Sequence, residues 1–226
     1  MPVRTELRAV LFDMDGTLVD TERLWRRTVE EEAVGRGIAL TDVDLAFVLG
    51  RAVEDCAAHL AARAEGRGDG RGEAAAIGDS LERRFTDLVR GQVVPLPGAV
   101  ELLAEIHAAG IPAALVSASP RQVVDTVLDA LGRHWFTVTV AAGETARTKP
   151  YPDPYLAALT ALGAAPASCV AVEDTPTGIA SAEGAGCGVV AVPALTTTIT
   201  PAPRRTVVRS LLDVDVALLR GVVATR

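Results

Sequence analysis

The chain has 226 residues, of which 49% are hydrophobic, and this is enough to bury a sizeable core in one large domain or in a domain with a smaller companion. Its net charge of −7 offers no basic surface to nucleic acid, so we expect no nucleic-acid partner. No apolar run approaches the roughly 20 residues that cross a bilayer, and residues 1–8 lack the pattern of a signal peptide, so we expect a cytoplasmic protein without a membrane partner.

The first predicted element is a strand over Ala9–Phe12, whose unbroken apolar run is typical of a parallel strand buried on both faces. Asp13, Asp15 and Gly16 follow directly. Because side chains alternate along an extended chain, the two carboxylates start on the same side of the backbone and repel each other unless a cation or a shared proton intervenes. Oxygen ligands at close quarters favour Mg²⁺. The alternative is a cap at Asp13 and an ordinary Asp-Gly turn.

Residues 21–92 are predicted to be helical throughout. Trp25, Val29 and Ala33 recur at i, i+4 and i+8 among charged residues, which indicates an amphipathic helix. The Gly-rich, charged run 65–72 predicts a flexible loop between two helices. We therefore expect an all-helical domain inserted after the first strand. Its other predicted helices span Asp42–Leu49, Glu54–Ala64 and Glu73–Arg90.

Residues 93–226 alternate predicted strands and helices, which is the pattern of a parallel sheet with right-handed crossovers. Together with residues 1–20 they form the predicted core, an α/β doubly wound parallel sheet of Rossmann-like type. Ser119 is the expected N-cap of the helix after the second strand, with Pro120 in its first turn. The predicted strands are Ile111–Val116, Phe136–Val140, Ser168–Val172, Gly188–Val192 and an edge strand at Thr206–Val208; the predicted helices follow Pro97-Gly98, Ser119, Pro152 and Thr175-Pro176, with a closing helix at Ser210–Leu219.

The cysteines and histidines show no metal-binding or catalytic pattern. Cys56, Cys169 and Cys187 are far apart and odd in number, so we expect buried thiols in a reducing compartment. The three histidines are scattered singly, which gives no support to a histidine metal site or a Ser-His-Asp triad.

A hydroxyl follows the second predicted strand. Ser117 lies at the strand's carboxyl end, where ligands bind in open α/β sheets. The backbone N–H groups after it open a helix, which makes a ready anion site. We predict that Ser117 contacts a phosphate group, whereas Ser119 only caps the helix.

The chain's single lysine follows the third predicted strand. Lys149 lies beside Pro150, Pro152 and Pro154, which stiffen the backbone around it. A compact charge on a flexible stem can pair with a phosphate oxygen and with the Asp13 carboxylate together. The alternative is a solvated surface lysine, and the rigid setting favours the site.

Two adjacent acids, Glu173 and Asp174, end the fourth predicted strand. Two carboxylates after an apolar strand are costly unless they meet a cation or helix N–H donors. Thr175 fits the cap position of the next helix better than Asp174 does. Metal coordination by the acidic pair is therefore favoured over capping.

The segment Asp13–Asp20, read as DMDGTLVD, resembles the first motif of the haloacid dehalogenase superfamily. Ser117, the Lys149-Pro150 loop and the pair Glu173-Asp174 resemble the other three motifs, in the same order. The helical insertion is similar to the cap of the beta-phosphoglucomutase-like and sugar-phosphate phosphatase branch. The resemblance implies a Mg²⁺-dependent phosphatase that acts on a small phosphorylated metabolite, a sugar phosphate above all.

The same resemblance assigns roles to the matched residues. It implies that Asp13 is the nucleophile, which forms an aspartyl-phosphate, and that Asp15 is the general acid and base. Mg²⁺ would be held by the Asp13 carboxylate, the Asp15 backbone carbonyl and Asp174, with Glu173 binding directly or through water. The implied phosphate contacts are Gly16, Ser117, the Ala118 N–H and Lys149.

The cap is expected to close over the site and select the leaving group. Gly50 and Arg51 are the candidate contacts to that group, and a solvated surface arginine is the alternative for Arg51. Mutases of this family carry a histidine where Trp25 stands here, so a mutase is the weaker alternative, beside a phosphoglycolate phosphatase. A non-enzymatic phospho-acceptor or binding module is the alternative from another class. For the oligomeric state we expect a monomer or a weak homodimer.

Overall fold

The computed structural model describes residues 6–48, 51, 53–64, 70–193 and 197–224. In this part of the chain, six parallel strands form one sheet in the order β3-β2-β1-β4-β5-β6. This is the doubly wound order, in which ligands bind beyond the carboxyl ends of the strands where the winding reverses, here between β1 and β4. The predicted fold class is confirmed. The strands are β1 (Ala9–Phe12), β2 (Ala113–Val116), β3 (Val138–Val140), β4 (Cys169–Glu173), β5 (Gly188–Ala191) and β6 (Arg205–Val207).

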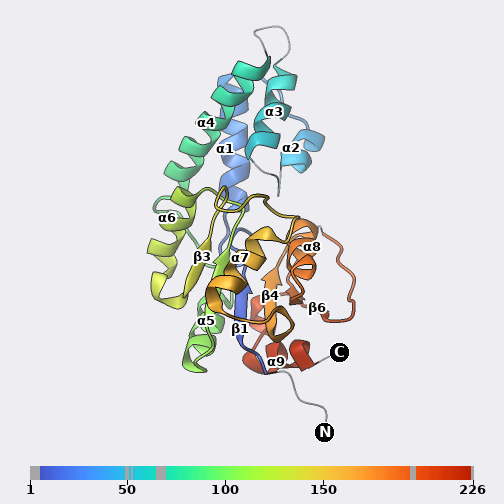
Figure 1. Cartoon of the computed structure of the whole chain (residues 1–226). Coiled ribbons are helices and arrows are strands. Elements are labelled where there is room, and N and C mark those ends of the chain that lie inside the picture. Colours follow the sequence, from blue (N-terminus) through green and yellow to red (C-terminus); the bar gives the residue numbers. More distant parts are fainter. Residues whose placement is uncertain (1–5, 49–50, 52, 65–69, 194–196, 225–226) are drawn as a thin grey trace.

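Helices cover both faces of the sheet (Figure 1). Val10 and Phe12 of β1 belong to the hydrophobic cluster under α5, α6 and α9, whereas Ala9 and Leu11 belong to the cluster under α7 and α8. All four residues are fully buried, which explains why this strand is apolar without alternation. The covering helices are α5 (Ala99–Ala108), α6 (Arg121–Leu131), α7 (Asp153–Leu162), α8 (Pro176–Gly184) and α9 (Val216–Ala224), and the short 3-10 helices are η1 (Arg133–Trp135), η2 (Pro166–Ser168) and η3 (Leu211–Asp213).

Four helices, here called the cap helices, stand beyond the carboxyl ends of the strands (Figure 1). Trp25, Val29 and Ala33 are buried and form the apolar stripe that the spacing predicts. Residues 65–69 of the predicted Gly-rich loop lie outside the described residues, and helix already begins at Gly70. The division into a core of residues 1–20 and 93–226 and a cap of 21–92 stays a prediction. The cap helices are α1 (Glu22–Gly35), α2 (Asp42–Val48), α3 (Val53–Arg63) and α4 (Gly70–Val89).

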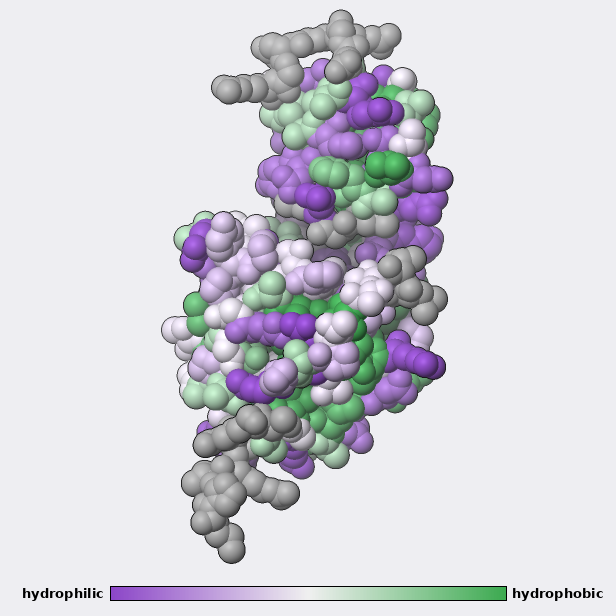
Figure 2. All heavy atoms as spheres, turned by 90° about the vertical axis from the view of Figure 1, so that its right-hand side faces the viewer, coloured by the Kyte–Doolittle hydropathy of each residue, from purple (hydrophilic) through white to green (hydrophobic). Residues whose placement is uncertain are grey.

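The cap helices carry many charged side chains on their outer faces. On the side shown in Figure 2, hydrophilic residues are abundant over these helices, at the top of the view. Exposed residues one helical turn apart form ion pairs, such as Arg26–Glu30 and Arg27–Glu31. Each such pair stabilises a helix by only about 0.3–0.5 kcal/mol, so the buried apolar stripe holds the cap together.

The chain's last segment differs from the single closing helix predicted at Ser210–Leu219. It forms the short helix η3 and then α9. The Ser210 hydroxyl accepts from the Leu212 N–H, and the Asp215 carboxylate accepts from the Leu218 N–H at 2.7 Å. Each residue thus starts its own segment. The predicted edge strand is confirmed as β6, one residue earlier.

Two further expectations concern the described residues as a whole. Cys56, Cys169 and Cys187 are buried free thiols, as predicted. None of the helices described here combines the length and the apolar character needed to span a bilayer.

Candidate active site

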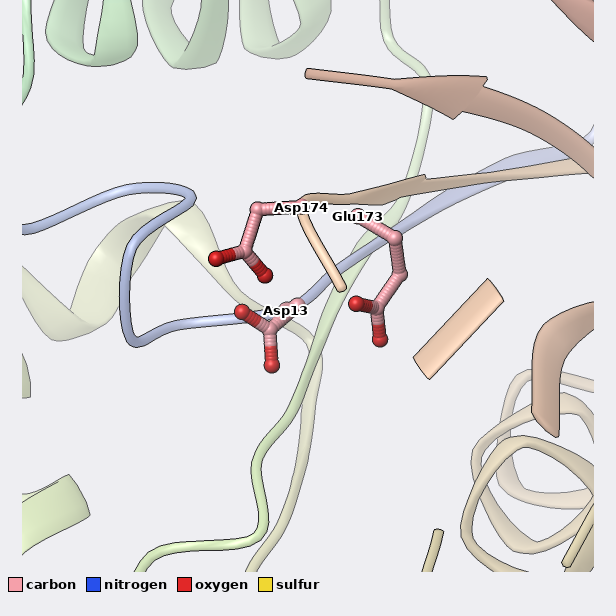
Figure 3. Close-up of side chains that lie close together, drawn as sticks. All are labelled: Asp13, Glu173 and Asp174. Carbon is pink, nitrogen blue, oxygen red and sulfur yellow. The ribbon is translucent and has the colours of Figure 1, made fainter. Parts of the chain in front are cut away.

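The candidate site lies where β1 and β4 end side by side. The Asp13 N–H donates to the Val172 carbonyl of β4 at 3.0 Å, so the first residue after β1 is held next to the end of that strand. Glu173 is the last residue of β4, and Asp174 follows it. Figure 3 shows the Asp13 and Asp174 carboxylates turned toward each other, while the Glu173 side chain leaves the strand in a different direction. The sheet therefore brings together two motifs that are 160 positions apart in the sequence.

Lys149 connects two of these acids. Its ammonium donates to Asp13 Oδ1 at 2.7 Å and to Glu173 Oε1 at 2.6 Å, and all three residues are buried. Burial alone would lower the pKa of Lys149, but the Asp13 and Glu173 carboxylates outweigh it and hold this pKa above its usual value. Lys149 is thus a buried, permanently charged group and not the solvated surface lysine of the alternative interpretation.

Tyr155 is a member of this network that the sequence did not reveal. Its side chain is fully buried in the hydrophobic cluster between the sheet and helices α7 and α8, and its hydroxyl donates to Glu173 Oε1 at 2.6 Å. The same oxygen therefore accepts from both Tyr155 and Lys149. Gly178 of α8 leaves the room for this carboxylate, since a Cβ at Gly178 would overlap it. Glu173 is thus held in one orientation by its neighbours.

Asp15 is held by three hydroxyl groups. Thr21 donates to Oδ1 at 2.6 Å, and Ser119 and Ser117 donate to Oδ2 at 2.8 and 3.1 Å. Burial, followed by the nearby Asp13 charge, nevertheless raises the pKa of Asp15. A carboxyl group that is oriented and more ready to keep its proton is suited to donate that proton to a leaving group.

The prediction that Ser119 caps the next helix is wrong. Helix α6 begins at Arg121 with Pro120 in the cap position, and no side chain caps it. The Ser119 hydroxyl instead donates to Asp15, and its N–H donates to the Ser117 hydroxyl at 2.9 Å. The Asp15 carboxylate, 104 residues away in the sequence, is the stronger acceptor for this hydroxyl. Ser117 likewise faces Asp15, and its predicted phosphate contact stays a prediction.

The acids at this rim fit a divalent cation. Asp13, Glu173 and Asp174 each offer a carboxylate oxygen, and these oxygens lie within 4.8 Å of one another. In the described part of the chain, Asp13 Oδ2 and Asp174 Oδ1 are buried and accept no hydrogen bond. Burial and then the Asp13 charge raise the pKa of Asp174 well above its usual range, and the nearby Lys149 charge does not offset them, as expected where acids are buried close together. Asp13 and Asp174 are the pair with oxygens to spare, because Glu173 already binds Lys149 and Tyr155.

Gly16 makes this arrangement sterically possible. Its φ of +80° lies in the left-handed region, and a Cβ there would overlap Asp174 Oδ2. The glycine of the first motif therefore makes room for the acid of the fourth. Its predicted contact with phosphate stays a prediction.

A cleft opens from this rim toward the cap helices. Arg51 lines it, as do Ala118 and Lys149, whereas Gly50 lies outside the described residues. Trp25 also lines the cleft, and its indole N–H donates to the Val48 carbonyl at 3.0 Å. The cap contributes Thr21, Glu22, Trp25, Arg51, Val53, Glu82 and Phe85 to the lining, and the core contributes Asp13, Asp15, Ala118, Ser119, Pro120, Thr148, Lys149, Asp174, Thr175 and Thr177.

Comparison with known proteins decides the family. Residues 7–186 match the model of the haloacid dehalogenase-like hydrolases. The chain belongs to this family. This haloacid dehalogenase-like hydrolase is 37% identical to hexitol phosphatase A of Escherichia coli K12, over 82% of each chain. It is 35% identical to protein CbbY of Rhodobacter capsulatus, over 83% of this chain and 86% of that protein.

Solved structures place the haloacid dehalogenase-like fold over nearly the whole chain. CbbY of Rhodobacter sphaeroides, crystallised with phosphate, superposes with a TM-score of 0.80 at 29% identity, covering 94% of this chain and 99% of that one. A mutant of the same protein has also been crystallised with xylulose-(1,5)bisphosphate. The predicted family and the prediction of an enzyme, a hydrolase with phosphatase-named relatives, are confirmed.

Proposed function

We propose that this haloacid dehalogenase-like hydrolase is a Mg²⁺-dependent phosphatase that releases inorganic phosphate from a sugar phosphate or sugar alcohol phosphate. The observation that carries the proposal is the Lys149 ammonium bound to Asp13 Oδ1 while Asp13 Oδ2 stays buried beside Asp174. One oxygen of Asp13 is thereby oriented and the other is left to react. The phosphatase names of the relatives and the phosphate bound to CbbY of R. sphaeroides support the same reaction.

In the proposed first step, Asp13 Oδ2 attacks phosphorus, and the bond from phosphorus to the leaving oxygen breaks. The carboxyl of Asp15 donates its proton to that oxygen, so the product leaves as a neutral alcohol. In the second step the Asp15 carboxylate takes a proton from water, whose oxygen attacks the phosphorus of the aspartyl-phosphate. The bond between phosphorus and Asp13 Oδ2 breaks, inorganic phosphate leaves, and Asp13 is again a carboxylate while Asp15 again carries its proton.

The cation would be held by Asp13 and Asp174, with the Asp15 backbone carbonyl as the third protein ligand proposed from the family motif. When bound, Mg²⁺ supplies positive charge that offsets the carboxylates and the phosphoryl group. Lys149 adds a fixed positive charge on the other side of Asp13. Glu173 keeps Lys149 in place, and we assign to it this positioning role ahead of direct metal binding.

Trp25 supports hydrolysis over the mutase alternative. An indole has no group that can exchange a proton with a sugar hydroxyl, and its N–H is already bound to the Val48 carbonyl. The cleft between cap and rim also favours an enzyme over a phospho-acceptor, because an acceptor has no use for a leaving-group pocket. The cytoplasmic location, the monomeric or weakly dimeric state and the lack of a nucleic-acid partner stay predictions.

Phosphate release tests the proposal. The purified protein would be assayed with Mg²⁺ on sorbitol 6-phosphate, glucose 6-phosphate, β-glucose 1-phosphate, phosphoglycolate and para-nitrophenyl phosphate. We expect release that EDTA abolishes, that added Mg²⁺ restores and that Asp13→Asn lacks. Isomerisation of β-glucose 1-phosphate without release would establish the mutase, and a stable phosphoprotein without release would establish the phospho-acceptor.

A further inference from the structure

Two carboxylates lie on the cap side of the cleft. Glu22 of α1 and Glu82 of α4 both line it. Within the described residues, no ion pair or side-chain hydrogen bond joins either of them to another group. Burial and then neighbouring acids raise the pKa of both, Asp20 first among the acids for Glu22 and Glu54 first for Glu82. A ligand in the cleft therefore meets two acidic side chains that have no cation partner among the described residues.

Few basic side chains balance the acidic side chains that line the cleft. Among the described residues that line the cleft, the cations are Lys149 and Arg51, and Lys149 is already bound to Asp13 and Glu173. Arg51 lies with its guanidinium 4.1 Å from the centre of the Phe47 ring. Other arginines of the cap helices pair with acids outside the lining, as Arg84 does with Glu32 at 2.9 Å. The lining thus has five carboxylates, namely Asp13, Asp15, Asp174, Glu22 and Glu82, against two cations.

The rest of the cap side is aromatic. The rings of Trp25 and Phe85 meet edge to face at 5.2 Å, and both line the cleft. Since the Trp25 N–H is bound within the cap, these rings offer apolar surface to a ligand. Ring faces next to carboxylates and a guanidinium suit a carbon skeleton that carries hydroxyl groups, which both donate and accept hydrogen bonds.

We propose that the cleft selects phosphate monoesters whose leaving group is an uncharged polyhydroxylated skeleton, and that Glu82, together with Glu22, rejects a second phosphate or a carboxylate. This inference rests on the proposed phosphatase activity and narrows its substrate class. A divalent cation and Lys149 can offset the charge of one phosphoryl group, whereas a second anion would face Glu22 and Glu82. Bisphosphates and phosphoglycolate should therefore be poor substrates, which would separate this chain from CbbY of R. sphaeroides, crystallised with a bisphosphate.

Matched substrates that differ in one charged group test the inference. The values of kcat/KM would be measured with Mg²⁺ for fructose 6-phosphate, glucose 6-phosphate and sorbitol 6-phosphate against the corresponding 1,6-bisphosphates, and for ethylene glycol phosphate against phosphoglycolate. We expect the uncharged leaving group to be favoured by about tenfold or more in the sugar series and in the glycol pair. Equal or better use of the bisphosphates or of phosphoglycolate would overturn the inference.

Variants assign the rejection to Glu82. Glu82→Lys should narrow the preference about fivefold or more by lowering KM for the bisphosphate, and Glu82→Gln should narrow it less. The control is Asp87→Lys, the same charge reversal on the same helix at an exposed position outside the lining, and it should leave the preference unchanged. An unchanged preference in Glu82→Lys would refute the role of Glu82.

para-Nitrophenyl phosphate distinguishes a failure of the proposed substrate preference from a failure of the proposed phosphatase activity. Hydrolysis of this aryl ester without the expected preference would overturn the inference and keep the phosphatase. Hydrolysis of the aryl ester alone, with no sugar or polyol phosphate accepted, would also overturn the inference. No phosphate release from any compound would overturn the proposed function, and the inference with it.

Discussion

The charged side chains on the core side of the cleft are paired with one another, whereas those on the cap side are not. On the core side, Lys149, Asp13 and Glu173 are buried and bonded to one another. On the cap side, Glu82 and Arg51 are exposed, and neither forms an ion pair within the described residues. The core groups are therefore oriented before any substrate arrives, whereas the cap groups are left for the substrate to satisfy. In the proposed function, the reaction takes place at the rim of the sheet and the cap selects the leaving group.

The largest effect is expected at Asp13. Asp13→Asn keeps the shape of the side chain but removes the nucleophilic oxygen, so turnover should fall about 10³-fold or more. The melting temperature should stay close to that of the wild type. Asp129→Asn, at an exposed position of α6, is the control and should keep full activity. Near wild-type turnover in Asp13→Asn would refute the nucleophile assignment.

Loss of Lys149 should affect stability as well as turnover. Lys149→Met leaves Asp13 and Glu173 as buried acids without their cation, which should lower the free energy of unfolding by about 3–5 kcal/mol. Adding Glu173→Gln removes one of the unpaired charges and should restore part of that loss, without restoring turnover. Urea denaturation and phosphate release measure the two effects. Full stability of Lys149→Met would contradict the buried ion-pair network.

A smaller effect is expected at Tyr155, which supports the buried charges on the core side through Glu173. Tyr155→Phe removes only the hydroxyl that donates to Glu173 Oε1 and keeps the buried ring. Because Glu173 positions Lys149, kcat should fall about tenfold while KM changes little, and the free energy of unfolding should fall by about 1–2 kcal/mol. Tyr151→Phe is the matched control at a half-exposed position. A change in KM alone would show that Tyr155 acts on substrate binding instead.

The smallest effect is expected in the cap, away from the cleft. The Thr41 N–H and hydroxyl, followed by His59, lower the pKa of Asp44 to about 2 from the usual 3.8. The charged carboxylate therefore contributes stability that is complete above pH 3.8 and is lost as the pH falls through about 2. Asp44→Asn should be less stable than the wild type at neutral pH, and the gap should close across that window.

Unfolding measured over a pH series tests this expectation, with exposed Asp42→Asn as the control. Activity should change little in either variant. A gap between Asp44→Asn and the wild type that stays constant down to pH 2 would contradict the assigned pKa.

The sequence predicted those parts of the site that depend on strand ends. Asp13, Lys149 and Asp174 follow strands whose carboxyl ends must meet at one edge of a parallel sheet, so their proximity follows from the topology. The hydrogen bonds from Thr21 and Ser119 to Asp15 were not predicted, and Ser119 was wrongly predicted as a helix cap, because the segment after a strand gives no sign of which acceptor a hydroxyl will choose.

The roles of Tyr155 and Glu82 could not be predicted, because they depend on how their helices pack. Tyr155 reads as an ordinary core aromatic, and its partner Glu173 is known only once α7 is placed under the sheet. Glu82 lies on a charged helix like many other acids, and only the packing of α4 beside α1 turns it toward the cleft. The prediction for Gly50 falls outside the described residues.

The covalent intermediate on Asp13 is the most direct test of the account. The protein would be mixed with Mg²⁺ and its best substrate, quenched in acid during turnover, and the peptides examined by mass spectrometry for a phosphoryl group. The account predicts the group on Asp13, its absence from Asp13→Asn and its decay at a rate no slower than turnover. Full-rate phosphate release with no phosphoryl group on Asp13 at any quench time would contradict it.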